Sequence, residues 1–325
     1  MNKKNLFFSR KTVASILLLL VAATVLLIVL LPGKDSWKFI VYGDTRTDEE
    51  NHKRVLSSMV ENTPDYQFIV NVGDVAQRGQ DTLHWNMWER ALNEVLGSTG
   101  QRGKKRYYVA TGNHEAILRG GLDNWKSYLH GQNSDYESTD GLYFTFDYKN
   151  VRVIIVNSLG DIAKQKAMIE EAAASNPHPW LFAAWHEPVF VYGNKEYQEE
   201  LHKEWGTILY ENGCDIIFTG HSHMYVRSEK LNLNGEKHPP LDEENGTVQV
   251  ISGNGGVPMR QIPIIDADGN GYLVAENAYN TNTDQFGYTE IEINGKKSLI
   301  LRHILIDGTV FDTETYTPNK KPHEK

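Results

Sequence analysis

The amino-acid sequence predicts an α/β fold in which two β-sheets pack face to face and helices cover their outer faces. Five short apolar runs, each ending in Gly, Asn, Asp or His, alternate with segments of helical periodicity. That alternation is typical of βαβ units and of a largely parallel sheet. After His223 the sequence changes to alternating apolar and polar residues around Gly- and Asn-containing turns, which indicates further strands.

The predicted elements follow in order along the chain. The five apolar runs, read as buried strands, are WKFIVYGD, YQFIVNVGD, RYYVATGNH, WLFAAWHEP and DIIFTGHSH. Apolar residues at three- and four-residue spacing predict helices over residues 51–62, 82–96, 164–175 and 196–212. The segments GLYFTFDY and VRVIIVNS meet at Lys149-Asn150 and predict a hairpin. Later strands are expected in TVQVISGNGG, GYLVAENAY, FGYTEIEING and KSLILRHILI.

The N-terminal segment predicts a membrane anchor. Residues 13–31, VASILLLLVAATVLLIVLL, carry no charge and are long enough to cross a bilayer as one helix. Basic residues precede this run, at Lys3, Lys4, Arg10 and Lys11. We therefore expect residues 1–34 to be a cytoplasmic flank and a transmembrane signal anchor, with the remainder outside the cytoplasm. The alternative is secretion after signal cleavage. Cleavage at the small-residue site before TVLLIVLL would leave that apolar stretch exposed, which favours the anchor.

Composition bounds the rest of the chain. Residues 35–317 are expected to form one domain, because no low-complexity linker or internal repeat divides them. The tail 318–325, PNKKPHEK, lacks apolar residues for packing and is expected to be disordered. The single cysteine, Cys214, rules out an internal disulfide. Because the net charge is −9 and a nucleic-acid scaffold needs a basic surface, no such role is expected.

Polar side chains of metal-binding types follow the five predicted strands. They are Asp44, Asp74, Asn113 with His114, His186, and the pair His221 and His223. Taken singly, a strand-terminal Asp is more often a turn former or helix cap, and a lone His is more often a core residue. Five strands that end in GD, GD, GNH, WH and GHSH argue against that reading. Ligands of open α/β sheets bind beyond the carboxyl ends of strands, so we expect one joint site.

These motifs together resemble the calcineurin-like metallophosphoesterase superfamily, which includes the purple acid phosphatases. The resemblance spans residues 38–225 and is carried by GDT at 43–45, GDVAQRG at 73–79, GNHE at 112–115, WHEP at 185–188 and GHSH at 220–223. It implies a four-layer αββα sandwich of two mixed sheets flanked by helices, with a two-metal centre at the strand ends. It also implies an enzyme that hydrolyses phosphoric esters.

The resemblance further implies a role for each matched residue. The implied metal ligands are Asp44, Asp74 and His223 for the first ion and Asp74, Asn113, His186 and His221 for the second, with Asp74 shared. His114 would bind no metal but would face the substrate, as general acid toward the leaving group. Glu115 is expected to orient His114. The glycine-rich SGNGG at 252–256 is expected to let the backbone approach the site closely.

The implied reaction needs these residue types. Two divalent ions about 3.5–4 Å apart share a water, lower its pKa and place the resulting hydroxide opposite the leaving oxygen of a phosphate. Two such ions outweigh Asp44, Asp74 and one hydroxide by about one unit of charge, which attracts an anionic substrate. Imidazole, carboxylate and amide ligands suit Mn, Fe, Co or Zn better than Ca, and the ion's identity stays open. A phosphorylated small molecule or another phosphoester is the expected substrate.

Arg46 departs from the superfamily's pattern. Many members have D-x-H at this place, with the histidine bound to the first metal, whereas Arg46 stays protonated and cannot coordinate. Purple acid phosphatases instead have a tyrosine three residues after the bridging aspartate, where this chain has Gln77. Arg46 is a clamp on a substrate phosphate, a structural partner of Asp48 or another carboxylate, or a sign of a degenerate first site. The clamp is favoured. His52 is a candidate replacement ligand, although a solvent-facing place on its helix is favoured.

The sequence therefore predicts a membrane-anchored, metal-dependent hydrolase of phosphate esters with a dinuclear centre and a bridging hydroxide. The alternative is a non-catalytic or single-metal scaffold protein that retains the fold, and only Arg46 and Gln77 favour it. The metal ligands do not separate monoesterase, diesterase and pyrophosphatase activities, so the class of ester stays open.

Overall fold

The computed structural model describes residues 36–97, 106–117, 120–129, 136–137, 141–190, 197–259, 279–283 and 285–320. The chain divides into a unit that ends at Ser36 and a unit from Trp37 to Lys325, and the fold lies in the second unit. The predicted anchor over 1–34 and most of the strand expected in GYLVAENAY lie outside the described residues. Within the described ranges, no helix is long and apolar enough to cross a membrane.

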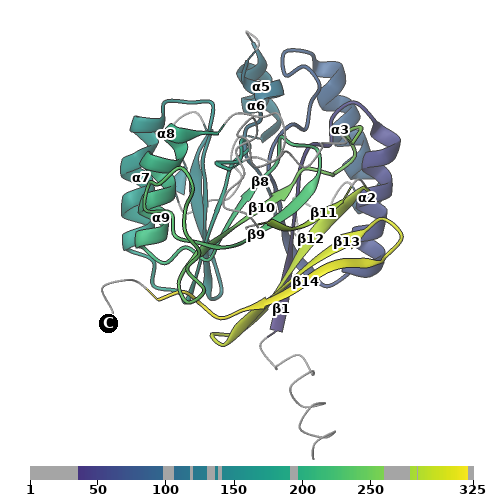
Figure 1. Ribbon diagram of the computed structural model, residues 1–325. Coiled ribbons are helices and arrows are strands. Elements are labelled where there is room, and N and C mark those ends of the chain that lie inside the picture. The colour runs from purple at the N-terminus through teal and green to yellow at the C-terminus, as the bar shows by residue number, and fades with distance from the viewer. Residues whose placement is uncertain are drawn as a thin grey trace, which may run out of the picture. The chain divides into compact units, whose positions relative to one another are not determined.

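The first of two mixed sheets has six strands in the order β14-β13-β12-β1-β2-β3 (Figure 1). Its strands are β1 (Ser36–Tyr42), β2 (Tyr66–Asn71), β3 (Arg106–Val109), β12 (Gly287–Asn294), β13 (Ser298–Leu305) and β14 (Val310–Tyr316). β1, β2 and β3 run parallel, and β12, β13 and β14 pair antiparallel. This sheet joins the first three predicted strands to the last part of the chain.

The second sheet has eight strands in the order β11-β9-β10-β8-β7-β6-β5-β4. They are β4 (Tyr136–Glu137), β5 (Phe144–Tyr148), β6 (Val151–Ile155), β7 (Trp180–Ala184), β8 (Ile216–Thr219), β9 (Tyr225–Leu231), β10 (Thr247–Ser252) and β11 (Tyr279–Thr283). The run β6-β7-β8-β10 is parallel. β5 and β6 form the hairpin predicted at Lys149-Asn150. The α/β fold with two mixed sheets flanked by helices is confirmed.

Side chains along β1 alternate between two hydrophobic cores. Phe39 and Val41 point between the sheets, where the Phe39 ring centroid lies 5.5 Å from that of Phe182 in β7. Ile40 and Tyr42 belong to the other core, which includes residues of the helices. Because successive strand residues point to opposite faces, a strand buried on both faces reads as a continuous apolar run. This explains the composition of WKFIVYGD.

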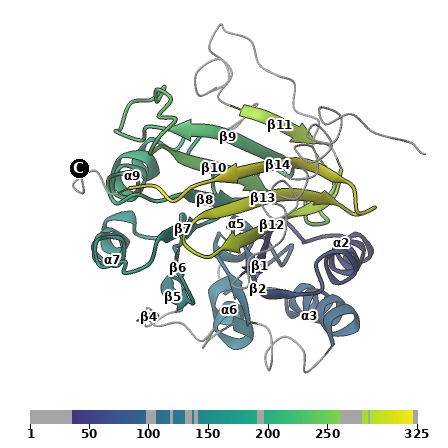
Figure 2. The same cartoon turned by 90° about the horizontal axis from the view of Figure 1, so that it is seen from below.

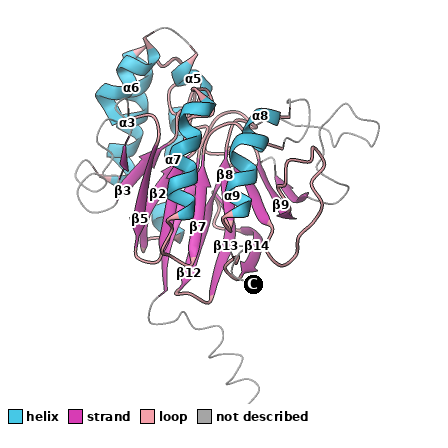
Figure 3. Cartoon of the chain, turned by 90° about the vertical axis from the view of Figure 1, so that its left-hand side faces the viewer, coloured by secondary structure: helices cyan, strands magenta, loops and turns pink. Residues whose placement is uncertain are grey.

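Helices lie beside both sheets (Figures 2 and 3). On the side of β1 and β2 lie α2 (Glu49–Asn62) and α3 (Thr82–Leu96). The short α5 (Asn113–Ala116) and α6 (Gly121–Leu129) follow β3 in the chain. Beside β7 lie α7 (Ile162–Ala174) and α9 (Thr207–Glu211). α2 begins two residues earlier than predicted, because Asp48 caps it by accepting a hydrogen bond from the Asn51 amide.

The helix predicted over 196–212 is interrupted. It comprises α8 (Glu199–Leu201), a π-helical turn (His202–Gly206) and α9. The buried His202 ring packs against Phe190, with ring centroids 4.8 Å apart, and its Nδ1 lies 2.6 Å from the Tyr197 hydroxyl. Residue periodicity predicts the helix but not this wider turn, because its three- and four-residue spacing does not distinguish one wide turn from regular α-helix.

Asn319 fixes the C-terminal segment to the domain. Its backbone N–H donates to Asp215 Oδ1 at 2.8 Å, and its side-chain amide donates to the carbonyl oxygens of Cys214 and Gly246, both at 2.9 Å. Lys230 Nζ donates to Asn319 Oδ1 at 2.7 Å. The disorder expected from residue 318 therefore does not extend to 318–320, and residues 321–325 lie outside the described part.

We expect Asn319→Ala to lower the free energy of unfolding of the full-length protein by about 1–3 kcal/mol, because two carbonyl groups lose their donor. Urea denaturation in mild detergent measures this change. Lys320→Ala is the control, since its side chain is 73% exposed in its contact with Glu244, and we expect a change within about 0.5 kcal/mol. Equal stability of the two variants would show that Asn319 does not hold the segment.

Candidate metal centre

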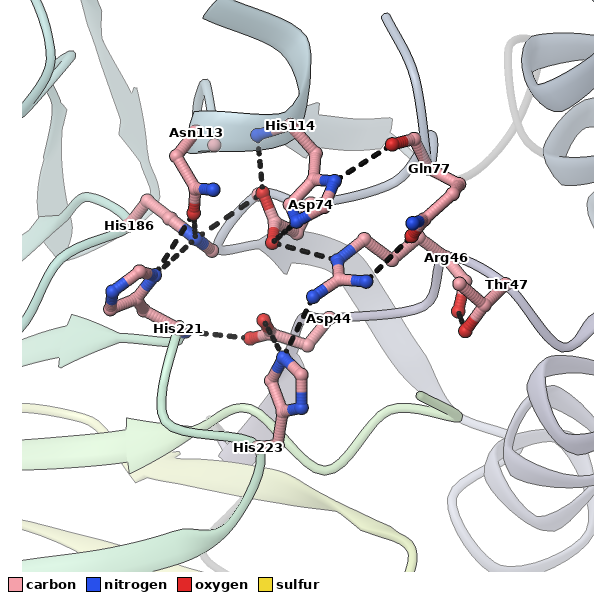
Figure 4. Close-up of polar contacts among 12 residues, drawn as sticks. Asp44, Arg46, Thr47, Asp74, Gln77, Asn113, His114, His186, His221 and His223 are labelled. Carbon is pink, nitrogen blue, oxygen red and sulfur yellow. Dashed lines mark hydrogen bonds and ion pairs between the residues drawn. The ribbon is translucent and has the colours of Figure 1, made fainter. Parts of the chain in front are cut away.

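The residues that follow five strands converge on one site (Figure 4). β1, β2 and β3 are parallel neighbours in the first sheet, and β7 and β8 are parallel neighbours in the second. The structure brings together every residue that the sequence assigns to the site: Asp44, Arg46, Asp74, Asn113, His114, His186, His221 and His223.

Four atoms of metal-ligand type form a compact cluster. Asn113 Oδ1 lies 3.1 Å from His186 Nε2 and 3.0 Å from His221 Nδ1, and these two nitrogens are 3.3 Å apart. His186 Nε2 also lies 3.3 Å from Asp74 Oδ1. Ligands bound at about 2.0–2.2 Å around a transition ion are spaced about 3.0–3.4 Å from their neighbours. Asn113 Oδ1, His186 Nε2 and His221 Nδ1 are therefore spaced as ligands of one metal ion would be, and Asp74 Oδ1 lies at the same spacing from His186 Nε2.

The orientation of His186 also fits a ligand. Its Nδ1 lies 2.8 Å from the carbonyl oxygen of Val72, which only accepts, so Nδ1–H donates and Nε2 faces the cluster. Burial acts to lower the pKa of His186, but the charge and hydrogen bond of Asp74, together with the charge of Asp44, raise it above its usual value. Burial acts to raise the pKa of Asp74, but the charge and hydrogen bond of His186, together with the charges of His114 and Arg46, hold it below its usual range. A metal ion would replace the proton shared by this pair.

A second group of candidate ligands lies beside the first. Asp44, Asp74 and His223 are buried, and each offers one atom within 4.8 Å of the others. Asp44 Oδ2 accepts a hydrogen bond from the His221 amide at 2.8 Å. Asp44 Oδ1 is buried and has no hydrogen-bond partner in the described part of the chain. Burial raises the pKa of Asp44 to about 7, because a charged carboxylate is costly away from water.

Four of the proposed ligands have left-handed backbone conformations. The φ angle is 56° at Asp44 and at Asp74, 68° at His221 and 46° at His223. Such conformations are sparsely populated for residues other than glycine, cost about 1–3 kcal/mol each and cluster at functional sites. The strain occurs at the residues whose side chains face one another, which supports a functional interpretation of the strand ends.

Glycines allow the strand ends to approach closely. A Cβ atom at Gly112 would collide with the backbone nitrogen and Oδ1 of Asp74. A Cβ atom at Gly253 would lie 2.7 Å from Asp44 Oδ2. The close approach expected of SGNGG is therefore confirmed, since Gly253 belongs to that segment.

Arg46 lies inside the site with 8% of its surface exposed. Its Nε donates to Asp74 Oδ2 at 2.9 Å, its Nη1 donates to Gln77 Oε1 at 2.6 Å, and its Nη2 lies 3.0 Å from His223 Nε2. Asp48, one partner expected in the structural interpretation, caps α2 instead. The carboxylate that pairs with Arg46 is the proposed shared ligand itself.

His114 faces the same site and is oriented by Gln77. His114 Nδ1 lies 2.7 Å from the Gln77 carbonyl oxygen and therefore carries a hydrogen, while Nε2 lies 3.9 Å from Asp74 Oδ2. Burial lowers the pKa of His114. Gln77 holds His114 through its backbone and Arg46 through its side chain. The motif GDVAQRG, which contains Gln77, did not predict either contact.

Glu115 supports the backbone of the site. Its Oε2 accepts hydrogen bonds from the amides of Asp74 at 3.0 Å and Gly112 at 2.9 Å, and its Oε1 accepts one from Ala76 at 2.9 Å. Burial raises the pKa of Glu115 to about 8. We expected Glu115 to orient the His114 ring, whereas its carboxylate ties the loop after β2 to the start of α5.

His52 is buried rather than solvent-facing, so that prediction is wrong. It is 1% exposed, and its Nε2 lies 3.0 Å from the Tyr42 hydroxyl, which in turn lies 2.7 Å from the Tyr107 hydroxyl. Burial lowers the pKa of His52 to about 3. The ring bonds to a tyrosine of β1, and this contact does not support a role as replacement metal ligand.

Residues 38–225 match the sequence profile of calcineurin-like phosphoesterases. The chain belongs to this family. Purple acid phosphatase 18 of Arabidopsis thaliana is 30% identical over 163 residues, which cover 46% of this chain and 36% of that protein. Probable purple acid phosphatase 20 of the same plant is 24% identical over 308 residues, which cover 86% of this chain and 68% of that protein. The chain thus spans 36–68% of these relatives' length.

Solved structures share the fold. A purple acid phosphatase from yellow lupin (Lupinus luteus) seeds aligns with a TM-score of 0.68 at 18% identity, covering 90% of this chain and 55% of that one. GAP50, the anchor in the inner membrane complex of Plasmodium, aligns with a TM-score of 0.63 at 12% identity, covering 89% of this chain and 91% of that one. At such identities these likenesses establish the calcineurin-like fold.

We expect Glu115→Gln to weaken metal binding about 10–100-fold, because an amide NH₂ would face backbone donors and displace the loop that carries Asp74. Calorimetric titration of the metal-free protein with Mn²⁺ measures the affinity. Glu61→Gln, at an exposed position of α2, is the control and is expected to bind as the wild type does. Unchanged affinity in Glu115→Gln would show that the loop does not depend on this carboxylate.

Proposed function

We propose that the protein is a metal-dependent hydrolase of phosphoric esters. The observation that carries the proposal is the cluster of Asp74 Oδ1, Asn113 Oδ1, His186 Nε2 and His221 Nδ1, with neighbouring atoms 3.0–3.3 Å apart. Membership of the calcineurin-like family and similarity to plant purple acid phosphatases support the reaction class. The ion is a transition metal such as Mn, Fe, Co or Zn, given imidazole, carboxylate and amide donors.

A bound ion would supply Lewis acidity and lower the pKa of a coordinated water. The chain's own residues bind and orient the ester. Asn113 and the N–H groups of Arg46 not used in its three contacts hold phosphoryl oxygens. The protonated ring of His114 would donate from Nε2 to the leaving oxygen, since the hydrogen on Nδ1 is committed to the Gln77 carbonyl.

The first ion of the predicted pair would be held by Asp44 and His223 together with Asp74. Both side chains are buried and lie near Asp74. The dinuclear centre with a bridging hydroxide is the arrangement that the sequence predicts for this position. Arg46 competes with the first ion for its ligands, because the guanidinium already contacts His223 and Asp74. The substrate is expected to be an anionic phosphoester, since the centre is cationic once an ion is bound.

We expect Asp74→Asn and His221→Ala each to reduce hydrolysis of an aryl phosphate at least about 100-fold, because each removes a ligand of the proposed ion. The assay uses full-length protein with its metal content measured. His178→Ala is the control. His178 precedes β7, whereas His186 follows it, so the two histidines lie at opposite ends of that strand. His178 Nε2 lies 3.0 Å from Asp147 Oδ2. Its rate is expected to match the wild type.

Full activity of Asp74→Asn or His221→Ala in metal-verified protein would contradict the assignments. A folded wild type that neither binds metal nor hydrolyses any ester under these conditions would favour the alternative, a scaffold protein that retains the fold. A screen of phosphomonoesters, diesters, nucleotides and phospholipid headgroups with Mn, Fe, Co and Zn then identifies the class of substrate.

Residues 1–34 carry a separate proposal, that an uncleaved helix anchors the protein with its catalytic domain outside the cytoplasm. The uncharged run 13–31 and the basic flank before it support this arrangement. We expect the protein to stay in the membrane pellet after alkaline extraction, and its domain to be cleaved by protease added outside intact cells. Cleavage that removes the N-terminal segment, with release of the remaining protein into the medium, would instead establish secretion.

A further inference from the structure

Arg46 is held at a defined place inside the site. The backbone amides of Thr45 and Arg46 both donate to the carbonyl oxygen of Asp74 at 3.1 Å, which fixes the turn after β1. The next residue, Thr47, has a left-handed φ of 75°. The guanidinium then contacts Asp74, Gln77 and His223 in one plane of donors (Figure 4). These backbone and side-chain contacts together hold the Arg46 guanidinium in a buried position.

The contact with His223 excludes a metal ion from the same nitrogen. His223 Nδ1 lies 3.2 Å from the carbonyl oxygen of Pro258, which only accepts, so Nδ1 carries the hydrogen of the neutral ring. The single lone pair of the ring is then on Nε2, which lies 3.0 Å from Arg46 Nη2. Arg46 has only donors and stays protonated. One lone pair serves either this hydrogen bond or a metal ion.

The two oxygens of Asp74 face different sides of the site. Oδ2 accepts from Arg46 Nε at 2.9 Å, whereas Oδ1 faces His186 Nε2 at 3.3 Å. Arg46 therefore engages the oxygen on the side of Asp44 and His223 and leaves the four-atom cluster on the other side intact. Of the first-site ligand atoms, Asp44 Oδ1 has no hydrogen-bond partner among the described residues.

We propose that the Arg46 guanidinium replaces the first metal ion of the family's pair, so that the centre binds one ion at Asp74, Asn113, His186 and His221. The proposal rests on the proposed function and specifies its metal centre. One divalent ion and the guanidinium outweigh the two carboxylates of Asp44 and Asp74 by about one unit of charge as long as a coordinated water is neutral, and a centre in that state attracts a phosphate. Arg46 is then the fixed second cation beside the reacting group.

Metal stoichiometry tests this assignment without reference to activity. Full-length protein is reconstituted with excess Mn²⁺, desalted and analysed by mass spectrometry of its metals. We expect about one ion per chain in the wild type and about two in Arg46→His, which removes the guanidinium and supplies a ligand in its place. The electron paramagnetic resonance spectrum is expected to change from that of an isolated Mn²⁺ ion to that of a coupled pair.

Matched variants keep the test specific. Arg78→His adds a histidine at an exposed position of the loop after β2 and is expected to keep the wild-type ion count. Asp44→Asn in the Arg46→His background is expected to lose the added ion. In the presence of Arg46, His221→Ala is expected to lose the single ion and His223→Ala to retain it, which tests the proposal even if Arg46→His does not fold.

Several results would overturn the proposal. Two ions in the wild type would overturn it and leave the proposed hydrolase standing. One ion in a folded Arg46→His protein would also overturn it, because the guanidinium would not be what excludes the second ion. Loss of the wild-type ion in His223→Ala rather than in His221→Ala would place the ion on the other side of Asp74. No ion and no hydrolysis in the folded wild type would overturn this proposal and the proposed function together.

Discussion

The Asp74 carboxylate is the group on which the rest of the site depends. One oxygen accepts the His114 amide at 3.0 Å and faces His186, and the other accepts the Arg46 guanidinium at 2.9 Å. Its backbone amide is held by Glu115, which binds the start of α5 as well. Each side of the site is therefore positioned through the same residue, and a small displacement of the loop after β2 would disturb both sides at once.

Burying charged carboxylates in left-handed backbone conformations costs free energy that the packing around them must offset. Asp44 and Asp74 are each at most 1% exposed and both adopt left-handed φ angles. Aromatic side chains between the two sheets pack against one another, with Tyr108 of β3 and Phe146 of β5 stacked at a centroid distance of 3.7 Å. An uncompensated buried carboxylate destabilises the folded state, so cations that bind there add to stability. An ion bound at the proposed site would therefore raise the stability of the folded state.

The sequence was sufficient for the two-sheet arrangement, for most strands and helices, and for the set of residues that meet at the strand ends, because strand-terminal motifs place side chains at one edge of a sheet. It did not predict β4, β9 or β14. It did not predict contacts made by backbone atoms, such as the carbonyl groups of Val72 and Pro258 that orient His186 and His223. The type of a residue does not predict which side chain its backbone carbonyl group will contact. The role of Asn319 was missed for a related reason, since a polar tail can be fixed by hydrogen bonds without burying apolar surface.

The central claim is that side chains from both sheets form a cage for a metal ion on the His186 side of Asp74. Anomalous diffraction from crystals of the Mn²⁺-loaded protein tests it most directly. The account predicts one peak about 2.0–2.2 Å from Asp74 Oδ1, Asn113 Oδ1, His186 Nε2 and His221 Nδ1, with the guanidinium of Arg46 still against Asp74 Oδ2. A peak bound by Asp44 and His223, or no peak between His186 and His221, would contradict it.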